Sequence, residues 1–312
     1  MNKILIHEVG LRDGLQMEKQ IAPLDLKISW INELIKANVD IIQLGSFVHR
    51  EKVPQMADTD AIFNHFKQTG LTSRHTILSA LVLNERGLDR GLACGVEMFC
   101  MGVSASDTHS RKNSGMSSEE ATPRIIAMAN SALKEGKRVQ VSVQSAFGCG
   151  YEGEVPAEVV LKIVRKYLEA GLKSISLADT AGHAYPDQVK RLYEQIFMLE
   201  PSTECACHFH NTYGMGLANC VAAMEVGVTS FESSFGGLGG CPFTKVAAGN
   251  VCTEDFVHFL QRTGKRNDIA LDLLIPLARD VAEYFRRDLP GLVYKTGPVP
   301  RFVHETLSSK PN

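Results

Sequence analysis

Residues 156–177 read PAEVVLKIVRKYLEAGLKSISL, and this stretch contains the repeating unit of the fold. Apolar residues recur at helical spacing along its first part, which predicts an amphipathic helix from Pro156 to Ala170. Proline suits the first turn of such a helix, and Gly171 suits its C-terminal stop. The short run Ser174–Leu177 then predicts a buried strand, and Val139–Gln144 predicts the strand before the helix. Together they form one β-α-β unit.

The same alternation of short strands and longer helices runs through most of the chain. Residues Ala218–Val226, closed by Gly227, predict another helix of this kind. Strands are expected at Lys3–Val9, Ile41–Gly45, Thr76–Leu81, Glu97–Val103, Val139–Gln144, Ser174–Leu177, Cys205–Phe209 and Ser230–Ser233. Their spacing of roughly 25 to 40 residues is what β-α-β units require. Eight consecutive units favour an α/β fold, a closed (β/α)8 TIM barrel, over an open doubly wound sheet.

The predicted barrel ends near residue 262, so we divide the chain into two parts. Residues 1–262 are expected to form the catalytic (β/α)8 barrel. Residues 263–312 are expected to form a C-terminal extension packed on the barrel, with helices over Ile269–Arg286. Prolines at positions 290, 298, 300 and 311 predict an irregular tail after these helices.

Composition and charge exclude several classes of function. The chain has 33 Lys and Arg against 35 Asp and Glu, and no stretch concentrates basic residues, so nucleic-acid binding finds no support. No apolar run approaches the roughly 18 residues of a membrane span, and the N-terminus lacks the pattern of a signal peptide. In a long chain without a secretory signal, the eight cysteines are expected to lie in a reducing compartment, and the absence of a C-x-x-C pair argues against a zinc ribbon or a thioredoxin-like site. We therefore expect a cytoplasmic protein that acts on a small molecule, without a nucleic-acid or membrane partner.

The ends of two predicted strands carry candidate metal ligands. Active sites of such barrels lie at the C-terminal ends of the strands, where the first strand runs into EVGLRDG at 8–14 and the seventh into CHFHN at 207–211. His208 and His210 are two positions apart, so both side chains point to one face. Because strands seven, eight and one are neighbours in a closed barrel, Asp13 converges with this pair. Imidazole and carboxylate together suit a divalent ion such as Mg²⁺, Mn²⁺, Co²⁺ or Zn²⁺.

A glycine-rich segment, FGGLGGCPF at 235–243, follows the eighth strand. Its backbone can approach a ligand closely, and such a loop could carry Cys241 in and out of the site. The alternative is a plain linker with an incidental cysteine. Asn250 follows nine residues later and is near enough to supply an amide oxygen to the same metal.

Polar side chains also end three further strands. Asp179 ends the sixth strand, either as a carboxylate at the barrel mouth or only as a cap of the next turn. Gln43 and Ser46 end the second strand as neutral hydrogen-bonding groups. The fourth strand is followed by a long polar segment in which Arg111 and Lys112 suit a phosphate-bearing ligand, or else form only a solvated loop.

Four motifs together resemble the 3-hydroxy-3-methylglutaryl-CoA (HMG-CoA) lyase family: EVGLRDGLQ at 8–16, SFV at 46–48, HFH at 208–210 and GLGGCPF at 237–243. This family belongs to a metal-dependent TIM-barrel superfamily of lyases and aldolases that also holds isopropylmalate and homocitrate synthases. The similarity runs over about residues 3–262. The resemblance implies retro-Claisen cleavage of a 3-hydroxy-3-substituted acyl-CoA, with HMG-CoA giving acetyl-CoA and acetoacetate. It also implies leucine degradation or ketone-body metabolism, and a homodimer.

The resemblance also assigns roles to residues. It implies that the metal, Mg²⁺ or Mn²⁺ with Co²⁺ or Zn²⁺ as alternatives, is held by Asp13, His208, His210 and Asn250. Arg12 would stabilise the enolate of acetyl-CoA, Cys241 would protonate it, and Asp179 or a metal-held water would take the hydroxyl proton. Gln43 belongs to the catalytic group by position, while Ser46, Arg111, Lys112 and Asn113 would bind the acyl-CoA substrate.

Two positions depart from the family pattern. Gln43 stands where the family usually has glutamate, and Asn211 stands where it usually has aspartate. A site that loses up to two negative charges binds metal more weakly or tolerates a different anionic substrate. Three alternatives therefore stay open: a lyase for a related 3-hydroxyacyl-CoA, a Claisen-condensing synthase or aldolase of the same superfamily, and a catalytically lapsed barrel that binds a ligand.

Overall fold

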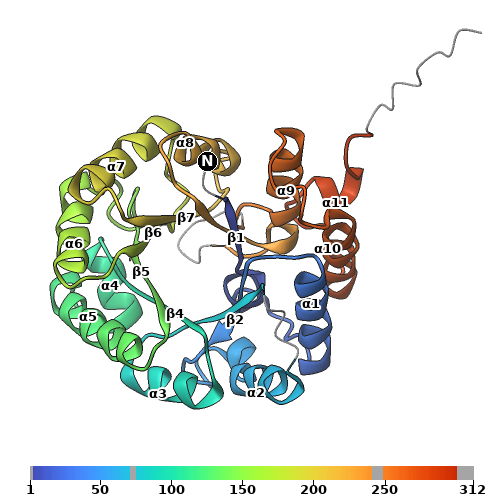
Figure 1. The fold of residues 1–312 in the computed structure, drawn as a ribbon, viewed down its shortest axis with the longest axis horizontal. Helices are drawn as coiled ribbons and strands as arrows, with labels where there is room; N and C mark the ends of the chain where they lie inside the picture. Colours follow the sequence, from blue (N-terminus) through green and yellow to red (C-terminus); the bar gives the residue numbers. More distant parts are fainter. Residues whose placement is uncertain (1–2, 71–74, 241–248, 301–312) are drawn as a thin grey trace, which may run out of the picture.

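Eight parallel strands close into a barrel (Figure 1), in a computed structural model that describes residues 3–70, 75–240 and 249–300. The strands are β1 (Leu5–Glu8), β2 (Ile41–Ser46), β3 (Ile77–Leu81), β4 (Met98–Ser104), β5 (Arg138–Gln144), β6 (Ser174–Asp179), β7 (Glu204–Phe209) and β8 (Ser230–Ser233). β1 pairs with β8 from Leu5 opposite Ser230 to Glu8 opposite Ser233, which closes the ring. The predicted (β/α)8 barrel is confirmed, and each predicted strand end lies within two residues of the observed one.

Helices surround the barrel in the order that β-α-β units require (Figure 1). They are α1 (Leu24–Lys36), α2 (Thr59–Thr69), α3 (Glu85–Cys94), α4 (Asp107–Ser114), α5 (Ser118–Lys134), α6 (Ala157–Glu169), α7 (Pro186–Leu199), α8 (Gly216–Glu225) and α9 (Thr253–Arg262). Three short turns lie at strand ends or in loops: η1 (Gly10–Gly14), η2 (Pro54–Met56) and η3 (Phe235–Gly237). In α6, Val160, Ile163, Val164 and Tyr167 are buried, as the predicted apolar face requires. None of the helices in the described ranges is long and apolar enough to span a membrane.

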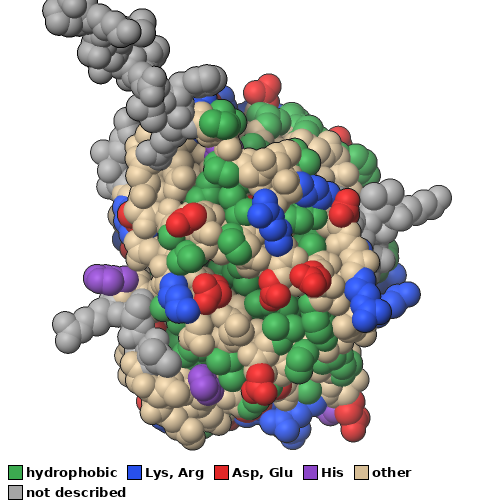
Figure 2. All heavy atoms as spheres, turned by 90° about the vertical axis from the view of Figure 1, so that its right-hand side faces the viewer, with side chains coloured by type: hydrophobic (Ala, Val, Ile, Leu, Met, Phe, Trp, Pro, Cys, Tyr) green, Lys and Arg blue, Asp and Glu red, His purple; other side chains and the backbone are tan. Residues whose placement is uncertain are grey.

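The described residues after α9, up to residue 300, pack against one side of the barrel, where α10 (Leu271–Phe285) and α11 (Val293–Thr296) lie beside α9 and α1 (Figure 1). Trp30 of α1 is buried there, and its ring lies 6.0 Å from that of Phe235 and 5.9 Å from that of Tyr284. The backbone N–H of Gly291 donates to the carbonyl of Gly236 at 2.9 Å. These contacts fix the turn that follows β8. Figure 2 faces this side, where hydrophobic, acidic and basic side chains are mixed on the surface. The division of the chain at residue 262 stays a prediction.

Alternation along each strand divides its side chains between the barrel interior and the helices. In β6, Ile175 and Leu177 belong to the apolar core, whereas Ser176 and Ala178 line a cavity inside the barrel. The interior at the C-terminal end is therefore polar, and the layer between strands and helices is apolar. This division decides which of the predicted site residues can reach a ligand.

Candidate active site

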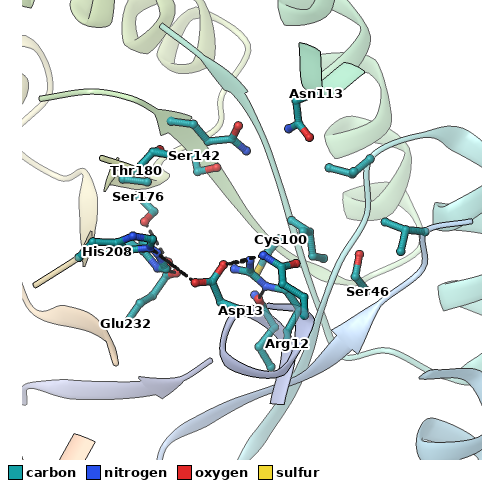
Figure 3. A pocket seen from close by; sticks show the side chains of 18 of the residues that line it. Arg12, Asp13, Ser46, Cys100, Asn113, Ser142, Ser176, Thr180, His208 and Glu232 are labelled. Carbon is teal, nitrogen blue, oxygen red and sulfur yellow. Dashed lines mark hydrogen bonds and ion pairs between the residues drawn. The ribbon is translucent and has the colours of Figure 1, made fainter. Parts of the chain in front are cut away.

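A cavity of about 280 Å³ opens inside the C-terminal end of the barrel (Figure 3). Residues from at least six strands or the turns after them line it, and most are polar. The polar lining comprises Arg12, Asp13, Gln16, Gln43, Ser46, His109, Asn113, Gln140, Ser142, Gln144, Ser176, Thr180, His208, His210 and Glu232. The cavity lies where active sites of (β/α)8 barrels lie, and its lining contains seven of the twelve residues predicted from the sequence.

Arg12 and Asp13 reach the cavity because the chain turns in a π-helical loop directly after β1. The carbonyl of Val9 accepts the backbone N–H groups of Arg12, Asp13 and Gly14, at 3.0, 2.8 and 3.3 Å. Gly14 permits close approach to the loop after β8, since a Cβ at this position would lie 2.9 Å from the Cβ of Leu238. π-helical turns recur at functional sites, and this one places Arg12 and Asp13 in the cavity lining.

Asp13 converges with His208 of β7 and with His210 just after that strand, as predicted. The Nε2 atoms of His208 and His210 lie 3.0 Å apart, and they lie 3.8 and 3.6 Å from Oδ2 of Asp13. One ligand atom from each of the three buried residues lies within 4.8 Å of the others. Two imidazole nitrogens and a carboxylate oxygen that face one another at buried positions match the donor set of a divalent cation.

Asn250 joins this group through the backbone. The residues after β8 return beside β7: His210 and Asn250 form an isolated antiparallel bridge, and Asn211 N–H donates to the Gly249 carbonyl at 2.8 Å. The Asn250 amide donates from Nδ2 to Oδ2 of Asp13 at 2.8 Å, while its buried Oδ1 has no hydrogen-bond partner among the described residues. Because buried polar atoms are normally paired, this oxygen fits the role of a cation ligand.

Gly239 makes room for that amide. Its φ angle is +116°, a conformation that favours glycine, and a Cβ there would lie 2.5 Å from Nδ2 of Asn250. The backbone of the glycine-rich loop at Gly239 therefore lies close to Asp13 and Asn250, two of the candidate metal ligands.

The charges of the site follow from burial and pairing. Burial opposes ionisation of Asp13, but Arg12 and the two histidines outweigh it and hold the pKa of this carboxyl well below its ordinary value. Burial lowers the pKa of His210. Burial alone would lower the pKa of His208, but its hydrogen bond to Glu232 and the charge of Asp13 outweigh burial, so the pKa of His208 is raised. Asp13 is therefore an anion at neutral pH, as metal binding requires.

Arg12 lies at the edge of the candidate metal site formed by Asp13, His208 and His210 (Figure 3), where two side chains hold it. Its Nε donates to the side-chain oxygen of Gln43, and its Nη1 donates to Oδ1 of Asp13. Gln16 donates to the same Oδ1 at 3.2 Å. The guanidinium is thus oriented inside the cavity and places a fixed positive charge beside any reacting group there.

The predicted substrate-binding residues divide into two groups. Ser46 and Asn113 line the cavity, and the buried hydroxyl of Ser46 has no hydrogen-bond partner among the described residues. Arg111 and Lys112 are exposed on α4 and do not line it. Nε of Arg111 lies 3.5 Å from Oδ2 of Asp107, and Nζ of Lys112 lies 3.6 Å from the centre of the Tyr151 ring.

The predicted residue Asp179 and the departure position Asn211 do not enter the cavity. Asp179 is fully buried, but its carboxylate accepts the backbone N–H groups of His183 at 2.8 Å and Ala184 at 3.1 Å. Burial raises its pKa to about 7. The side chain of Asn211 accepts the N–H of Gly216 at 2.9 Å and so ties the turn to α8. Of the two amide replacements, only Gln43 therefore acts within the cavity. Cys241 lies outside the described residues.

Glu232 of β8 is a residue of the site that sequence reasoning missed. Its carboxylate lies in the cavity wall, and its Oε2 is 2.9 Å from Nδ1 of His208. The available signal was a glutamate inside the predicted strand Ser230–Ser233, because glutamate is rarely buried without a partner. The register of the sheet, which sets this residue opposite His208, identifies that partner.

Comparisons with known proteins agree with this geometry. The sequence pattern of the HMGL-like family matches residues 3–281. A hydroxymethylglutaryl-CoA lyase of Bacillus subtilis is 37% identical over 290 residues, 93% of this chain and 95% of that protein. An (R)-citramalyl-CoA lyase of Chloroflexus aurantiacus is 36% identical over 305 residues, 96% of both chains. The solved structure of an HMG-CoA lyase from Acinetobacter baumannii, in complex with coenzyme A and 3-methylmalate, is similar with a TM-score of 0.88 and 34% identity, covering 99% of this chain and 98% of that one.

Proposed function

Because the chain belongs to the HMGL-like family and is a carbon–carbon lyase, we propose that it cleaves HMG-CoA to acetyl-CoA and acetoacetate. The observation that supports this most directly is the convergence of Asp13, His208 and His210 beside Arg12 in one buried cavity. A cation site next to a fixed guanidinium suits a reaction in which a hydroxyl is deprotonated and a carbon–carbon bond breaks toward an enolate.

The donor set supports a divalent metal as cofactor, and we propose Mg²⁺ or Mn²⁺, with Co²⁺ or Zn²⁺ as alternatives. Asp13, His208, His210 and Asn250 would hold it. When bound, such an ion supplies Lewis-acid polarisation of the substrate hydroxyl and of an acyl oxygen.

Arg12 carries the next part of the mechanism. When the bond between C2 and C3 of the acyl group breaks, its electron pair passes to C2 and onto the thioester oxygen, while C3 becomes a ketone. The Arg12 guanidinium, already oriented by Gln43 and Asp13, would stabilise the negative charge that develops on this oxygen.

Two proton transfers complete the reaction. We assign protonation of C2 to the thiol of Cys241 as general acid; its neighbour Gly240 lines the cavity. Asp179 stays a candidate for the hydroxyl proton, because burial raises the pKa of its carboxyl to about 7. Its two backbone hydrogen bonds point it away from the cavity wall, and a solvent molecule in the site is the alternative acceptor.

Substrate contacts follow from the position of each residue. Ser46 and Asn113 would contact the acyl portion, because they line the cavity. Arg111 and Lys112 lie on the exposed face of α4 and would meet the phosphates of CoA at the rim. Resemblance alone supports a homodimer that acts in leucine degradation or ketone-body metabolism, and the cytoplasmic location stays an expectation from the sequence.

Gln43 favours a second candidate, cleavage of (R)-citramalyl-CoA. This substrate has its carboxylate directly on the carbinol carbon, one methylene closer to the cleaved bond than in HMG-CoA. A neutral amide beside Arg12 leaves the guanidinium free of a second carboxylate, so a nearby substrate carboxylate meets less repulsion. The similar lyase of Chloroflexus aurantiacus carries that substrate in its name.

Acetyl-CoA release from each of the two substrates, with Mg²⁺ or Mn²⁺ present, tests the proposal. The expected result is turnover of HMG-CoA that Cys241→Ala abolishes while the fold and metal binding persist. Turnover of citramalyl-CoA alone would replace the first candidate with the second. Bound metal with no cleavage of either would refute both, and no metal binding at millimolar concentration would favour a lapsed, ligand-binding barrel.

A further inference from the structure

Glu232 is a buried carboxylate that the mechanism above does not use. It is the third residue of β8, and the sheet register sets it opposite His208 of β7. Its side chain points into the barrel just below the cation group (Figure 3), and the residue is only 6% exposed. A charged group so deep in a barrel needs partners, because an unpaired buried charge is strongly destabilising.

Three strands supply those partners. Oε1 of Glu232 accepts Nε2 of Gln140 on β5 at 2.7 Å and the hydroxyl of Ser176 on β6 at 2.9 Å. Oε2 lies 2.9 Å from Nδ1 of His208. With one oxygen anchored by two donors, the carboxylate can turn only its second oxygen to the imidazole, so its position is fixed by β5, β6 and β7 together.

The two histidines differ in this respect. Nδ1 of His210 is buried without a hydrogen-bond partner among the described residues, and the backbone bridge to Asn250 places that side chain instead. His208 has a carboxylate on its Nδ1, while its Nε2 faces His210 and Asp13.

We propose that Glu232 is a positioning residue that holds the proton of His208 on Nδ1 and presents its bare Nε2 to a divalent cation. A carboxylate accepts a hydrogen bond from imidazole but cannot donate one when ionised, so this contact selects a single tautomer. The contact also fixes the orientation of the ring and makes Nε2 a stronger electron-pair donor to a metal ion. Loss of such a partner typically lowers the affinity for the metal roughly 10- to 100-fold. The proposal rests on the cation site and is independent of which acyl-CoA is cleaved.

The test is metal binding by the substrate-free protein after treatment with a chelator. Mn²⁺ affinity is measured by calorimetry for the wild type and for Glu232→Gln, which keeps the volume of the side chain but removes its charge. We expect the dissociation constant to rise roughly 10- to 100-fold. Because no substrate is present, a wrong substrate assignment leaves this result unaffected.

Asp40→Asn is the matched control. Asp40 is also a buried carboxylate, but it pairs with Arg266 and accepts the N–H of Ile6 at 2.9 Å, away from the cavity. This variant loses a comparable buried charge and is expected to keep wild-type Mn²⁺ affinity. Equal losses in both variants would mean general loosening of the barrel and would overturn a positioning role, as would unchanged affinity in Glu232→Gln.

A second readout covers the case in which Glu232→Gln does not fold. Imidazole ¹⁵N NMR of the metal-free wild type reports which nitrogen of His208 carries the proton. Measured in alkaline solution, where the ring is neutral and carries one proton, we expect the Nδ1–H form, and a mixture of tautomers in the variant where it folds. Observation of the Nε2–H form in the wild type would overturn the proposal by itself.

Discussion

Replacing Asp13 with asparagine tests the cation site most directly. Asp13→Asn preserves the shape of the side chain and removes its charge. The carboxylate is the one anionic member of the ligand group found among the described residues. Its Oδ2 receives the amide of Asn250 at 2.8 Å, and its Oδ1 receives Arg12. After the substitution, the guanidinium of Arg12 keeps Gln43 but loses its anionic partner, and its positive charge repels an incoming cation.

The expected magnitude follows from electrostatics. A unit charge and a divalent ion about 4 Å apart attract by ~8 kcal/mol at an effective dielectric constant of roughly 20. The retained amide oxygen and the hydration of the free ion offset part of this energy, and we expect a net loss of ~3 to 4 kcal/mol. Each 1.4 kcal/mol changes the affinity about tenfold, so the dissociation constant for Mn²⁺ should rise by roughly 10² to 10³.

Asp179→Asn provides a matched control for this measurement, because it makes the same substitution at another buried strand end. The carboxylate of Asp179 binds two backbone N–H groups and does not line the cavity. An asparagine can accept with only one atom, so we expect a stability loss of ~1 to 3 kcal/mol in urea unfolding, with unchanged Mn²⁺ affinity. Wild-type affinity in Asp13→Asn, or equal weakening in both variants, would refute the assignment of Asp13 as a ligand.

Three further outcomes are expected. Arg12→Gln should lower kcat on the order of 10³-fold with little change in KM in steady-state assays, because it removes enolate stabilisation; a change confined to KM would contradict this role. Gln43→Glu should strengthen Mn²⁺ binding and shift the ratio of kcat/KM values toward HMG-CoA over citramalyl-CoA, whereas an unchanged ratio would exclude Gln43 as a specificity determinant. Burial lowers the pKa of His7 from 6.5 to about 4, so the unfolded chain binds the extra proton first. Stability should therefore fall by about 3 kcal/mol as pH drops from 6.5 to about 4. His7→Gln should remove this part of the pH dependence of the free energy of unfolding, measured by urea titration. The same pH dependence in both proteins would rule out His7 as its source.

The fold and the convergence of the candidate metal ligands could be predicted because both depend on local patterns and on one rule of topology. Strand and helix periodicity gave eight β-α-β units, and closure of the ring makes β1 and β7 near neighbours through β8. Asp13 lies in the turn after the first strand, and His208 and His210 stand two positions apart at the end of the seventh. No side-chain detail was needed to bring these three residues together.

The rest depended on the direction of single side chains, which the sequence pattern left open. In β6, Ser176 and Ala178 face inward, so Asp179 falls on the opposite parity and caps a backbone turn instead. Asn211 directly follows His210 of the candidate metal site, yet its side chain turns to the start of α8. Glu232 was missed for the converse reason, since its importance appears only once the register sets it opposite His208.

The ligand group spans the seam at which the barrel closes, and this has a consequence for stability. Asp13 follows β1, the histidines come from β7, and Asn250 comes from the segment after β8, so a complete site exists only after β1 pairs with β8. A cation that binds only the closed barrel stabilises it by about 2.7 kcal/mol at one hundred times its dissociation constant. Adding Mn²⁺ to the chelator-treated protein should therefore raise the Tm, and Asp13→Asn should lose this rise at the same Mn²⁺ concentration. An equal rise in the variant would mean that the ion stabilises the protein at another place.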